Sequence, residues 1–366
     1  MAEHIGPVPA GRGSLAVTQA HTMEGTSMGR SRWLIGMAIV VLGGVALASG
    51  LWAQAKPEQV TIGYQVIPNA EIVGKQLGWF EKEMGVKISW KQFDSGRDVN
   101  TAIASGGLDM GLVGTSPAAA GIARGLPYEV VWIHDLEGEN ESLVVKKGKG
   151  IKAVGDLVGK KVATPFGSTT HYSLLGALKV FKVEPAKVKI LDMQPPDMLA
   201  AWQRGDLDAG YVWEPTLKKM VDADGEIVLT SRQMAEKGYL TGDVAVVRKA
   251  FAEKYPDLVV KYLQVQAKGV ELWMKNPKDA AAAVAKAFSI SPEEAEREMR
   301  TLVWVAGREQ LSDPYLGTSA KRGKFAKVED DQVRARPGRL REGDQSLVSR
   351  ESHQVGVCPS KSGATP

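Results

Sequence analysis

Hydrophobic and polar positions along the first part of the chain predict a β-α-β order. Residues 59–66 (QVTIGYQV) alternate as the residues of a half-buried strand do. Apolar residues then recur at helical spacing up to Gly85, which predicts one helix over 69–85. A second strand is predicted at 86–93 (VKISWKQF), and a short buried strand at 108–114 (LDMGLVG).

The same alternation continues further along the chain. Five more strands are predicted, at 130–135, 142–147, 159–166, 188–193 and 207–213, with helical stretches among them. Strands that alternate with helices form parallel sheets with crossover helices, so we expect an α/β fold. From residue 251 to 306 the pattern is strongly helical, and Ser291 followed by Pro292 marks the start of a helix.

Two short segments of the chain resemble each other. Residues 106–113 (GGLDMGLV) match residues 205–212 (GDLDAGYV) at Gly, Leu, Asp, Gly and Val, and a predicted helix precedes each. We expect each copy to be a helix that ends on glycine, followed by a strand. The match predicts two α/β lobes of like design, with a ligand at the strand ends where the lobes face one another.

Composition fits a globular protein and excludes several classes of function. The length of 366 residues allows two domains. The residues are 44% hydrophobic and 24% charged, which is ordinary for a globular protein. The net charge of +4 is spread over 46 basic and 42 acidic residues without aromatic-laced basic blocks, so we expect no nucleic-acid partner. The single cysteine, Cys358, excludes a disulfide framework, a cysteine zinc site and a C-x-x-C redox centre. We therefore expect a small-molecule partner, with no metal and no cofactor.

The N-terminal part of the chain has the pattern of an export signal. Residues 28–55 contain two arginines, an apolar run and then Ala-Gln-Ala, which predicts a cleaved signal peptide and a mature protein that begins at Lys56 in the periplasm. A membrane anchor is the alternative, because the apolar run approaches the length of a spanning helix. Residues 1–27 lack apolar periodicity, and we expect them to be a non-native extension ahead of a start at Met28.

The C-terminal tail differs from the rest of the chain. Residues 327–366 are polar, contain few aliphatic residues and follow neither a helical nor a strand period. We expect this segment to be disordered, or aberrant in origin, and to carry no function.

Hydroxyl-bearing residues open predicted helices directly after predicted strands. A helix N-terminus presents unpaired N–H groups and the positive end of the helix dipole, so hydroxyls placed there favour anion binding. Taken singly each group is an ordinary N-cap, but three in one chain are better explained by convergence on one ligand. The groups are Ser168, Thr169 and Thr170; Thr115 and Ser116; and, more weakly, Asp94 and Ser95.

Catalysis is an alternative interpretation of the segment 164–175 (TPFGSTTHYSLL). It would require His171 to act as the base for a hydroxyl nucleophile. A residue one to three positions after the hydroxyl points to another face of the first helical turn, and the chain has no G-x-S-x-G elbow. We therefore favour anion binding.

Aromatic and acidic residues complete the predicted site. Tyr64 and Gln65 stand at the end of the first strand, and Trp213 ends the strand at 207–213 ahead of Glu214. Glu141 and Asp243 stand where the chain would cross between lobes. One of these two carboxylates would meet a ligand ammonium; the alternatives are a solvated surface acid for each, and simple packing for the tryptophan.

The chain resembles the periplasmic taurine-binding proteins of ABC importers. The resemblance runs from about Val60 to Lys324 and is most specific at STTHYSLL, QPP and AAWQRGDLDAGYVWEP. The wider family includes binders of alkanesulfonates, nitrate and thiamine precursors. One departure is that the amphipathic terminal helix of the family is missing after Lys324, which puts the packing of the first lobe in doubt.

The resemblance implies the two-lobe periplasmic binding protein fold, type II. Each lobe would be a mixed, mostly parallel sheet flanked by helices, and the two would close around a ligand. Residues 56–140 and 244–326 would form the first lobe, and residues 141–243 the second.

The resemblance also implies roles for individual residues and a function. Ser116, Thr169 and Thr170 would hold sulfonate oxygens, Glu141 and Asp243 match positions that can meet the amine, and Trp213 would cover the two-carbon spacer. The protein would be a monomeric, non-enzymatic solute-binding protein that captures taurine or a related sulfonate and delivers it to the membrane subunits of an ABC permease.

Two alternatives remain open. The ligand could be an aliphatic sulfonate or another small anion. The protein could instead be an enzyme like the pyrimidine synthases of thiamine biosynthesis, although the cysteine-rich motif of those enzymes is absent.

Overall fold

The computed structural model describes residues 55–318 and 321–322. The chain divides into a unit at 1–55 and a unit at 56–366, and the described helices and strands belong to the second. The predicted signal peptide, apart from Ala55, the predicted extension at 1–27 and the predicted tail at 327–366 lie outside the described residues. In the described part of the chain, no helix combines the length and the apolar character needed to cross a membrane.

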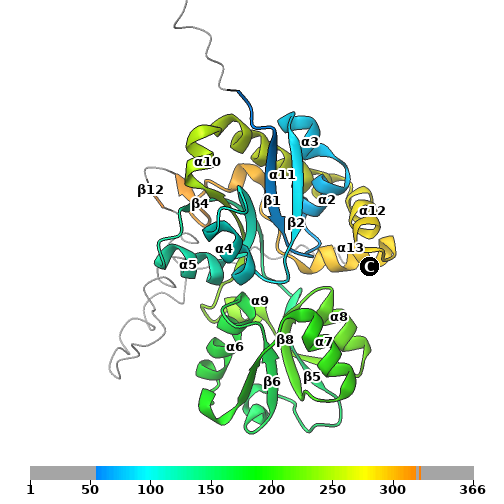
Figure 1. Ribbon diagram of the computed structural model, residues 1–366. Helices are drawn as coiled ribbons and strands as arrows, with labels where there is room; N and C mark the ends of the chain where they lie inside the picture. The colour runs from blue at the N-terminus through cyan, green and yellow to red at the C-terminus, as the bar shows by residue number, and fades with distance from the viewer. Residues whose placement is uncertain (1–54, 319–320, 323–366) are drawn as a thin grey trace, which may run out of the picture. The chain divides into compact units, whose positions relative to one another are not determined.

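The first lobe is built on a sheet with the strand order β2-β1-β3-β10-β4 (Figure 1). Its strands are β1 (Gln59–Tyr64), β2 (Lys87–Gln92), β3 (Met110–Gly114), β4 (Tyr128–Leu136) and β10 (Gly242–Arg248). Strand β1 pairs in parallel with β2 and β3, whereas β10 lies antiparallel between β3 and β4.

The second lobe repeats this design in a sheet with the order β7-β6-β8-β5-β9. Its strands are β5 (Glu141–Lys146), β6 (Lys161–Thr164), β7 (Lys189–Asp192), β8 (Ala209–Trp213) and β9 (Gly225–Thr230). Here β5 is the reversed strand, antiparallel to β8 and β9. Each sheet therefore has four strands in one direction and one reversed strand, which confirms the mixed, mostly parallel prediction. Both reversed strands come directly after the chain has passed from one lobe to the other.

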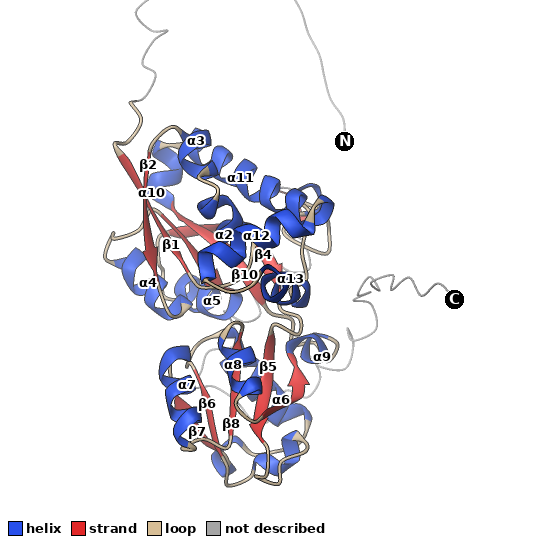
Figure 2. Cartoon of the chain, turned by 90° about the vertical axis from the view of Figure 1, so that its right-hand side faces the viewer, coloured by secondary structure: helices blue, strands red, loops and turns tan. Residues whose placement is uncertain are grey.

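Helices pack on both faces of each sheet (Figure 2). In the first lobe they are α2 (Ala70–Gln76), α3 (Trp79–Met84), α4 (Gly96–Ala104), α5 (Thr115–Ala123), α10 (Lys249–Lys254), α11 (Pro256–Lys275), α12 (Pro277–Phe288) and α13 (Pro292–Thr301). In the second lobe they are α6 (Thr169–Val180), α7 (Pro195–Arg204), α8 (Thr216–Asp222) and α9 (Ser231–Ala235). Short elements complete the fold: η1 (Val154–Leu157), η2 (Pro185–Lys187), η3 (Gly307–Glu309), β11 (Gly317–Thr318) and β12 (Lys321–Arg322). Each lobe has apolar core clusters of its own, and burial of these side chains is the main stabilising term.

Helix ends confirm one prediction and correct another. Ser291 caps α13, because its side chain accepts a hydrogen bond from the Glu294 N–H at 3.0 Å. The single helix predicted over 69–85 is wrong, since the chain forms α2 and α3 with a break at Gly78. Gly78 has a φ of 63°, a left-handed conformation that glycine adopts without steric cost. The break also leaves Leu77, one of the apolar residues at helical spacing in this segment, 44% exposed.

The two similar segments occupy equivalent places in the two lobes. They form β3 and β8, each the third strand of its sheet. In the first lobe Asp109 Oδ2 accepts a hydrogen bond from the Thr61 N–H at 3.0 Å, and in the second Asp208 Oδ2 accepts one from the Lys161 N–H at 2.9 Å. In each lobe, the aspartate just before the central strand therefore accepts a hydrogen bond from a backbone N–H of the neighbouring strand. The prediction of two lobes of like design is confirmed.

Candidate ligand-binding site

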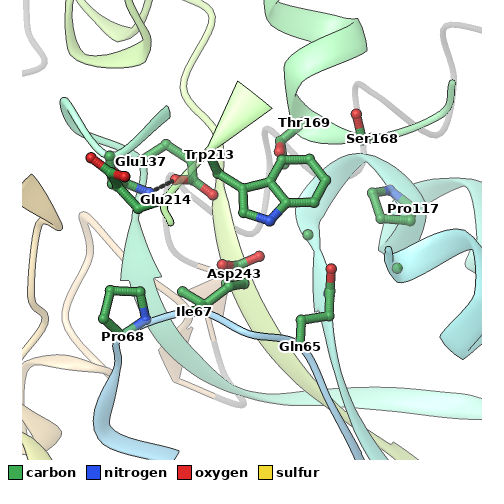
Figure 3. A pocket seen from close by; sticks show the side chains of 13 residues that line it. Gln65, Ile67, Pro68, Pro117, Glu137, Ser168, Thr169, Trp213, Glu214 and Asp243 are labelled. Atoms are coloured by element: carbon green, nitrogen blue, oxygen red, sulfur yellow. Dashed lines mark hydrogen bonds between the residues drawn. The ribbon is translucent and has the colours of Figure 1, made fainter. Parts of the chain in front are cut away.

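One pocket is lined by residues from both lobes (Figure 3). The thirteen lining residues are Gln65, Ile67, Pro68, Gly96, Gly114, Pro117, Glu137, Asn140, Ser168, Thr169, Trp213, Glu214 and Asp243. Five of the predicted site residues are thus brought together: Gln65, Ser168, Thr169, Trp213 and Asp243. They come from the ends of β1 and β8, the start of α6 and the first residues of β10.

The first turn of α5 carries two hydroxyls without partners, on the predicted site residues Thr115 and Ser116, which do not themselves line the pocket. Strand β3 ends at Gly114 and the helix begins at Thr115, so the helix N-terminus follows the strand without a loop. Thr115 Oγ1 and Ser116 Oγ are buried and have no hydrogen-bond partner within the described residues. Buried hydroxyls normally have a partner, so these two are available to a ligand or to water. The neighbouring Gly114 and Pro117 line the pocket.

The start of α6 uses most of its hydroxyls for local structure. Ser168 Oγ accepts from the His171 N–H at 3.2 Å and donates to the Pro165 carbonyl at 2.6 Å, which makes it the N-cap. Thr170 Oγ1 is buried between Ser168 Oγ at 2.7 Å and Thr164 Oγ1 at 2.8 Å, and it does not line the pocket. The free backbone N–H groups of this first turn are therefore better placed for an anion than these two hydroxyls.

The starts of α5 and α6 approach each other closely at Gly114. A Cβ atom added at this glycine would lie 2.7 Å from Thr169 Cγ2 and 3.6 Å from Asp243 Oδ1. Residues of the two lobes are therefore in van der Waals contact here, and no side chain other than hydrogen fits between them. Two helix N-termini from different lobes therefore lie at one pocket; that they share a ligand stays a prediction.

Three carboxyl groups meet at another part of the pocket, where Glu137 and Asp243 belong to the lining and Asp135 lies outside it. Asp135, Glu137 and Asp243 are buried, and one oxygen atom of each lies within 4.8 Å of the others. Burial, followed by the charge of neighbouring carboxylates, raises the pKa of all three well above the usual range. Oxygen atoms in this arrangement can accept hydrogen bonds from an ammonium group or coordinate a metal cation. The thirteen lining residues include no Lys, Arg or His.

Glu214 and Glu141 differ in how they relate to the pocket. Glu214 lines it and accepts a hydrogen bond from the Lys218 N–H at 2.9 Å, and burial raises its pKa to about 7. Glu141 is fully buried behind Thr169, and its contacts are hydroxyls of Thr169, Ser173 and Ser231. The sequence placed Glu141 at the ligand, whereas in the structure it does not line the pocket.

Trp213 supplies an apolar surface between the polar groups. It ends β8, where it pairs with Glu141 of β5. In Figure 3 the indole lies between the carboxyl groups of Glu137 and Glu214 and the hydroxyls of Ser168 and Thr169. A half-buried indole face in this position can pack against methylene groups of a ligand.

Three other predicted residues lie away from the pocket lining. Tyr64 borders a second hollow, where Lys75 Nζ lies 4.5 Å from its ring centroid. Asp94 is exposed. Ser95 is buried, and its Oγ accepts a hydrogen bond from Gln194 Nε2 of the second lobe at 3.1 Å.

His171 has structural contacts. Its Nδ1 accepts a hydrogen bond from the Gly167 N–H at 3.2 Å, and its ring stacks on Phe166 with centroids 4.5 Å apart. Ser168 Oγ receives its hydrogen bond from the His171 backbone, not from the imidazole. The imidazole is therefore not placed as the base of a serine nucleophile.

Sequence reasoning did not select Glu137 or Asn140 as site residues, and it named Glu214 only at the strand end with Trp213. The acidic residues at 135–139 were a usable signal for Glu137, since they stand at the end of the strand predicted at 130–135 and directly after it. Glu214 follows the selected Trp213. Asn140 Nδ2 donates to Glu137 Oε2 and its side chain accepts from the Gly138 N–H at 2.7 Å, so it holds the segment between β4 and β5 in place.

Comparison with known proteins places the chain in a family. A family model described as "NMT1/THI5 like" matches residues 69–280. The chain is 40% identical to the taurine-binding periplasmic protein of Escherichia coli (strain K12) over 233 residues, 62% of the chain and 72% of that protein. It is 32% identical to a putative aliphatic sulfonates-binding protein of Bacillus subtilis (strain 168) over 238 residues, 64% of the chain and 70% of that protein.

Solved structures agree on the fold. The alkanesulfonate-binding protein SsuA from Xanthomonas axonopodis pv. citri, bound to MOPS, aligns with a TM-score of 0.62 at 21% identity, covering 69% of this chain and 89% of that one. The periplasmic aliphatic sulphonate binding protein SsuA from Escherichia coli aligns with a TM-score of 0.58 at 24% identity, covering 68% and 84%. With its two lobes, its pocket between them and these matches, the chain has the periplasmic binding protein fold and belongs to the NMT1/THI5-like family.

Proposed function

We propose that this protein is a periplasmic substrate-binding protein that captures taurine and delivers it to the membrane subunits of an ABC permease. The 40% identity to a taurine-binding periplasmic protein supports this ligand. In this proposal the protein acts as a monomer and is exported by the signal peptide predicted at residues 28–55. Binding and release make up its whole activity, and no bond is formed or broken.

The observation that carries the proposal is the division of the pocket into two chemically opposite parts. Two helix N-termini, with the unpartnered hydroxyls of Thr115 and Ser116, favour an anion. The carboxyl groups of Glu137 and Asp243 favour a cation, and none of the lining residues is basic. A zwitterion with a sulfonate at one end and an ammonium at the other satisfies both parts. A plain alkanesulfonate would leave the buried acids without a partner, which costs affinity.

The proposed pose assigns a part of taurine to each group of residues. The sulfonate lies between the starts of α5 and α6, near Ser116 and Thr169. The ammonium donates to Asp243 and Glu137. The two methylene groups pack on Trp213.

Calorimetric titration of the mature protein with taurine and with ethanesulfonate tests the proposal. The two ligands share the sulfonate, and only taurine carries the ammonium. We expect saturable heat with taurine and at least tenfold weaker binding of ethanesulfonate, because a hydrogen bond to a charged group contributes about 1.5–3 kcal/mol. A flat titration with every sulfonate, or equal affinities for the two, would contradict the proposal.

The second candidate ligand is an aliphatic sulfonate. It is favoured by the raised pKa of Asp135, Glu137 and Asp243, because neutral carboxyl groups tolerate a ligand without an ammonium. The same titration separates the two candidates, since this alternative predicts that ethanesulfonate binds as tightly as taurine or more tightly. Mass spectrometry of the exported protein tests the location: we expect an N-terminus at Lys56.

A further inference from the structure

The hydroxyl of Thr169 can donate its single hydrogen either to Glu141 or to a ligand in the pocket, but not to both. Thr169 lines the pocket, and its Oγ1 is hydrogen-bonded to Glu141 Oε2. A hydroxyl carries a single O–H donor, whereas its oxygen can accept more than one hydrogen bond. If Thr169 donates to an ionised Glu141, only its lone pairs remain for the pocket. In that state it cannot donate to a sulfonate oxygen.

The contacts of Glu141 show which of its oxygens can carry a proton. Glu141 is 0% exposed. Its Oε1 accepts hydrogen bonds from Ser231 Oγ at 2.7 Å and Ser173 Oγ at 3.5 Å. Its Oε2 contacts Thr169. A proton on this carboxyl group therefore belongs on Oε2, where it points at Thr169 Oγ1.

Burial favours the neutral form of Glu141, whereas its hydrogen bonds from three hydroxyls favour the ionised form. Its own contacts on α6 and α9 are uncharged hydroxyls. Tyr211 of β8 hydrogen-bonds with Ser231, with Tyr211 Oη 3.0 Å from Ser231 Oγ. Burial raises the pKa of Tyr211, so its hydroxyl stays protonated. The charge of an ionised Glu141 in turn raises the pKa of Asp135, Glu137 and Asp243 in the carboxyl cluster. None of the described groups in contact with Glu141 is basic, so a sulfonate at Thr169 would add a further negative charge.

We infer that Glu141 is a positioning residue that sets the hydrogen-bond direction of Thr169, and that the sulfonate binds to the form in which neutral Glu141 donates to Thr169 and Thr169 donates to the ligand. The inference rests on the proposed function. It also replaces the role predicted for Glu141 from the sequence, in which its carboxylate would meet the ligand amine.

A pH dependence follows from this arrangement. Burial raises the pKa of Glu141 from 4.5 to about 7. Below this value Glu141 is neutral and Thr169 can donate to the ligand, and above it a proton must be taken up on binding. Affinity for the sulfonate group should therefore fall as the pH rises from 6 to 8, by roughly tenfold for one proton. Ethanesulfonate is the appropriate probe, because it lacks an ammonium whose binding to the carboxyl cluster would oppose this trend.

Two substitutions separate positioning from a merely structural role. In Glu141→Gln the side-chain amide donates to Thr169 at every pH, so ethanesulfonate affinity should stay near the wild-type value at pH 6 and lose its dependence on pH. In Thr169→Val the hydroxyl is lost, so affinity should fall at least tenfold at pH 6, also without pH dependence. Ser173→Ala removes the long 3.5 Å contact to Glu141 Oε1 and leaves Thr169 in place, so affinity should still fall with rising pH, with the midpoint at a slightly higher pH because the Ser173 hydrogen bond lowers the pKa of Glu141. Thermal melts of each variant check that it is folded.

Titration of the ligand-free protein keeps the test independent of the ligand. The carboxyl carbon resonance of Glu141, assigned by its loss in Glu141→Gln, should titrate near pH 7 and shift to higher pH in Thr169→Val, because the Thr169 hydrogen bond lowers the pKa. A resonance that titrates near pH 4.5, or that Thr169→Val leaves unmoved, would overturn the inference whether or not a sulfonate binds. So would a Glu141→Gln protein with the wild-type pH profile. If wild type binds no sulfonate while the resonance behaves as expected, the proposed function fails and the Glu141–Thr169 pairing stands.

Discussion

At the scale of single residues, the proposed binding of the taurine ammonium depends on the carboxylate of Asp243. Asp243→Asn keeps the shape of this buried side chain and removes its charge. We expect taurine affinity to fall at least tenfold, since a charge-assisted hydrogen bond to the ammonium is weakened. Ethanesulfonate affinity should be unchanged or higher, because a negative charge has left the pocket. Calorimetry with both ligands measures the two effects.

A matched control exists for this substitution. Asp94→Asn changes an exposed aspartate that does not line the pocket, so both affinities should stay at the wild-type values. If Asp243→Asn weakened both ligands equally, the carboxylate would be supporting the fold of the pocket instead of binding an ammonium.

At the scale of elements, the proposed binding of the sulfonate depends on the contact between the starts of α5 and α6. Gly114→Ala introduces a Cβ atom 2.7 Å from Thr169 Cγ2 and pushes the two helix N-termini apart. We expect taurine affinity to fall at least tenfold in calorimetry, because anion-binding groups must converge within a few tenths of an ångström. Gly155→Ala is the control, since its added Cβ meets nothing within 4 Å, and it should bind taurine as wild type does. Wild-type affinity in Gly114→Ala would show that the helix starts do not share a ligand.

Sequence patterns predicted the local parts of these elements and missed what depends on long-range pairing. Helix starts after strands, such as Thr169 after β6, are visible in a short window of sequence. Glu137 and Asp135 were not selected because they approach Asp243 only where β10 inserts between β3 and β4, with Asp243 paired to both Asp135 and Gly114. No local pattern reports that insertion. The break at Gly78 was missed for a different reason: the apolar period continues across it, although the backbone does not.

At the scale of the whole molecule, a buried acid outside the pocket makes stability depend on pH. Glu71 is 0% exposed and lies 3.3 Å from Tyr262 Oη and 3.4 Å from His134 Nε2, and burial raises its pKa from 4.5 to about 8. Between these values the folded protein holds a proton that the unfolded chain has lost, so the free energy of unfolding falls as the pH rises. Glu71→Gln should reduce this slope by about 1.4 kcal/mol per pH unit, measured by urea unfolding of the ligand-free protein at pH 6 and 8. Glu83→Gln, a change at an exposed position of α3, should leave the pH dependence of the unfolding free energy as in wild type. A wild-type pH dependence in Glu71→Gln would show that Glu71 is not the buried group that takes up the proton.

A crystal structure of the mature protein with taurine would show whether the two parts of the pocket hold the two ends of one ligand. We expect sulfonate oxygens within hydrogen-bond distance of the first turns of both α5 and α6, and the ammonium within hydrogen-bond distance of Asp243. The methylene groups should lie against Trp213. Taurine in the reversed orientation, or bound at a place that leaves the two helix starts without a ligand, would contradict the proposed pose.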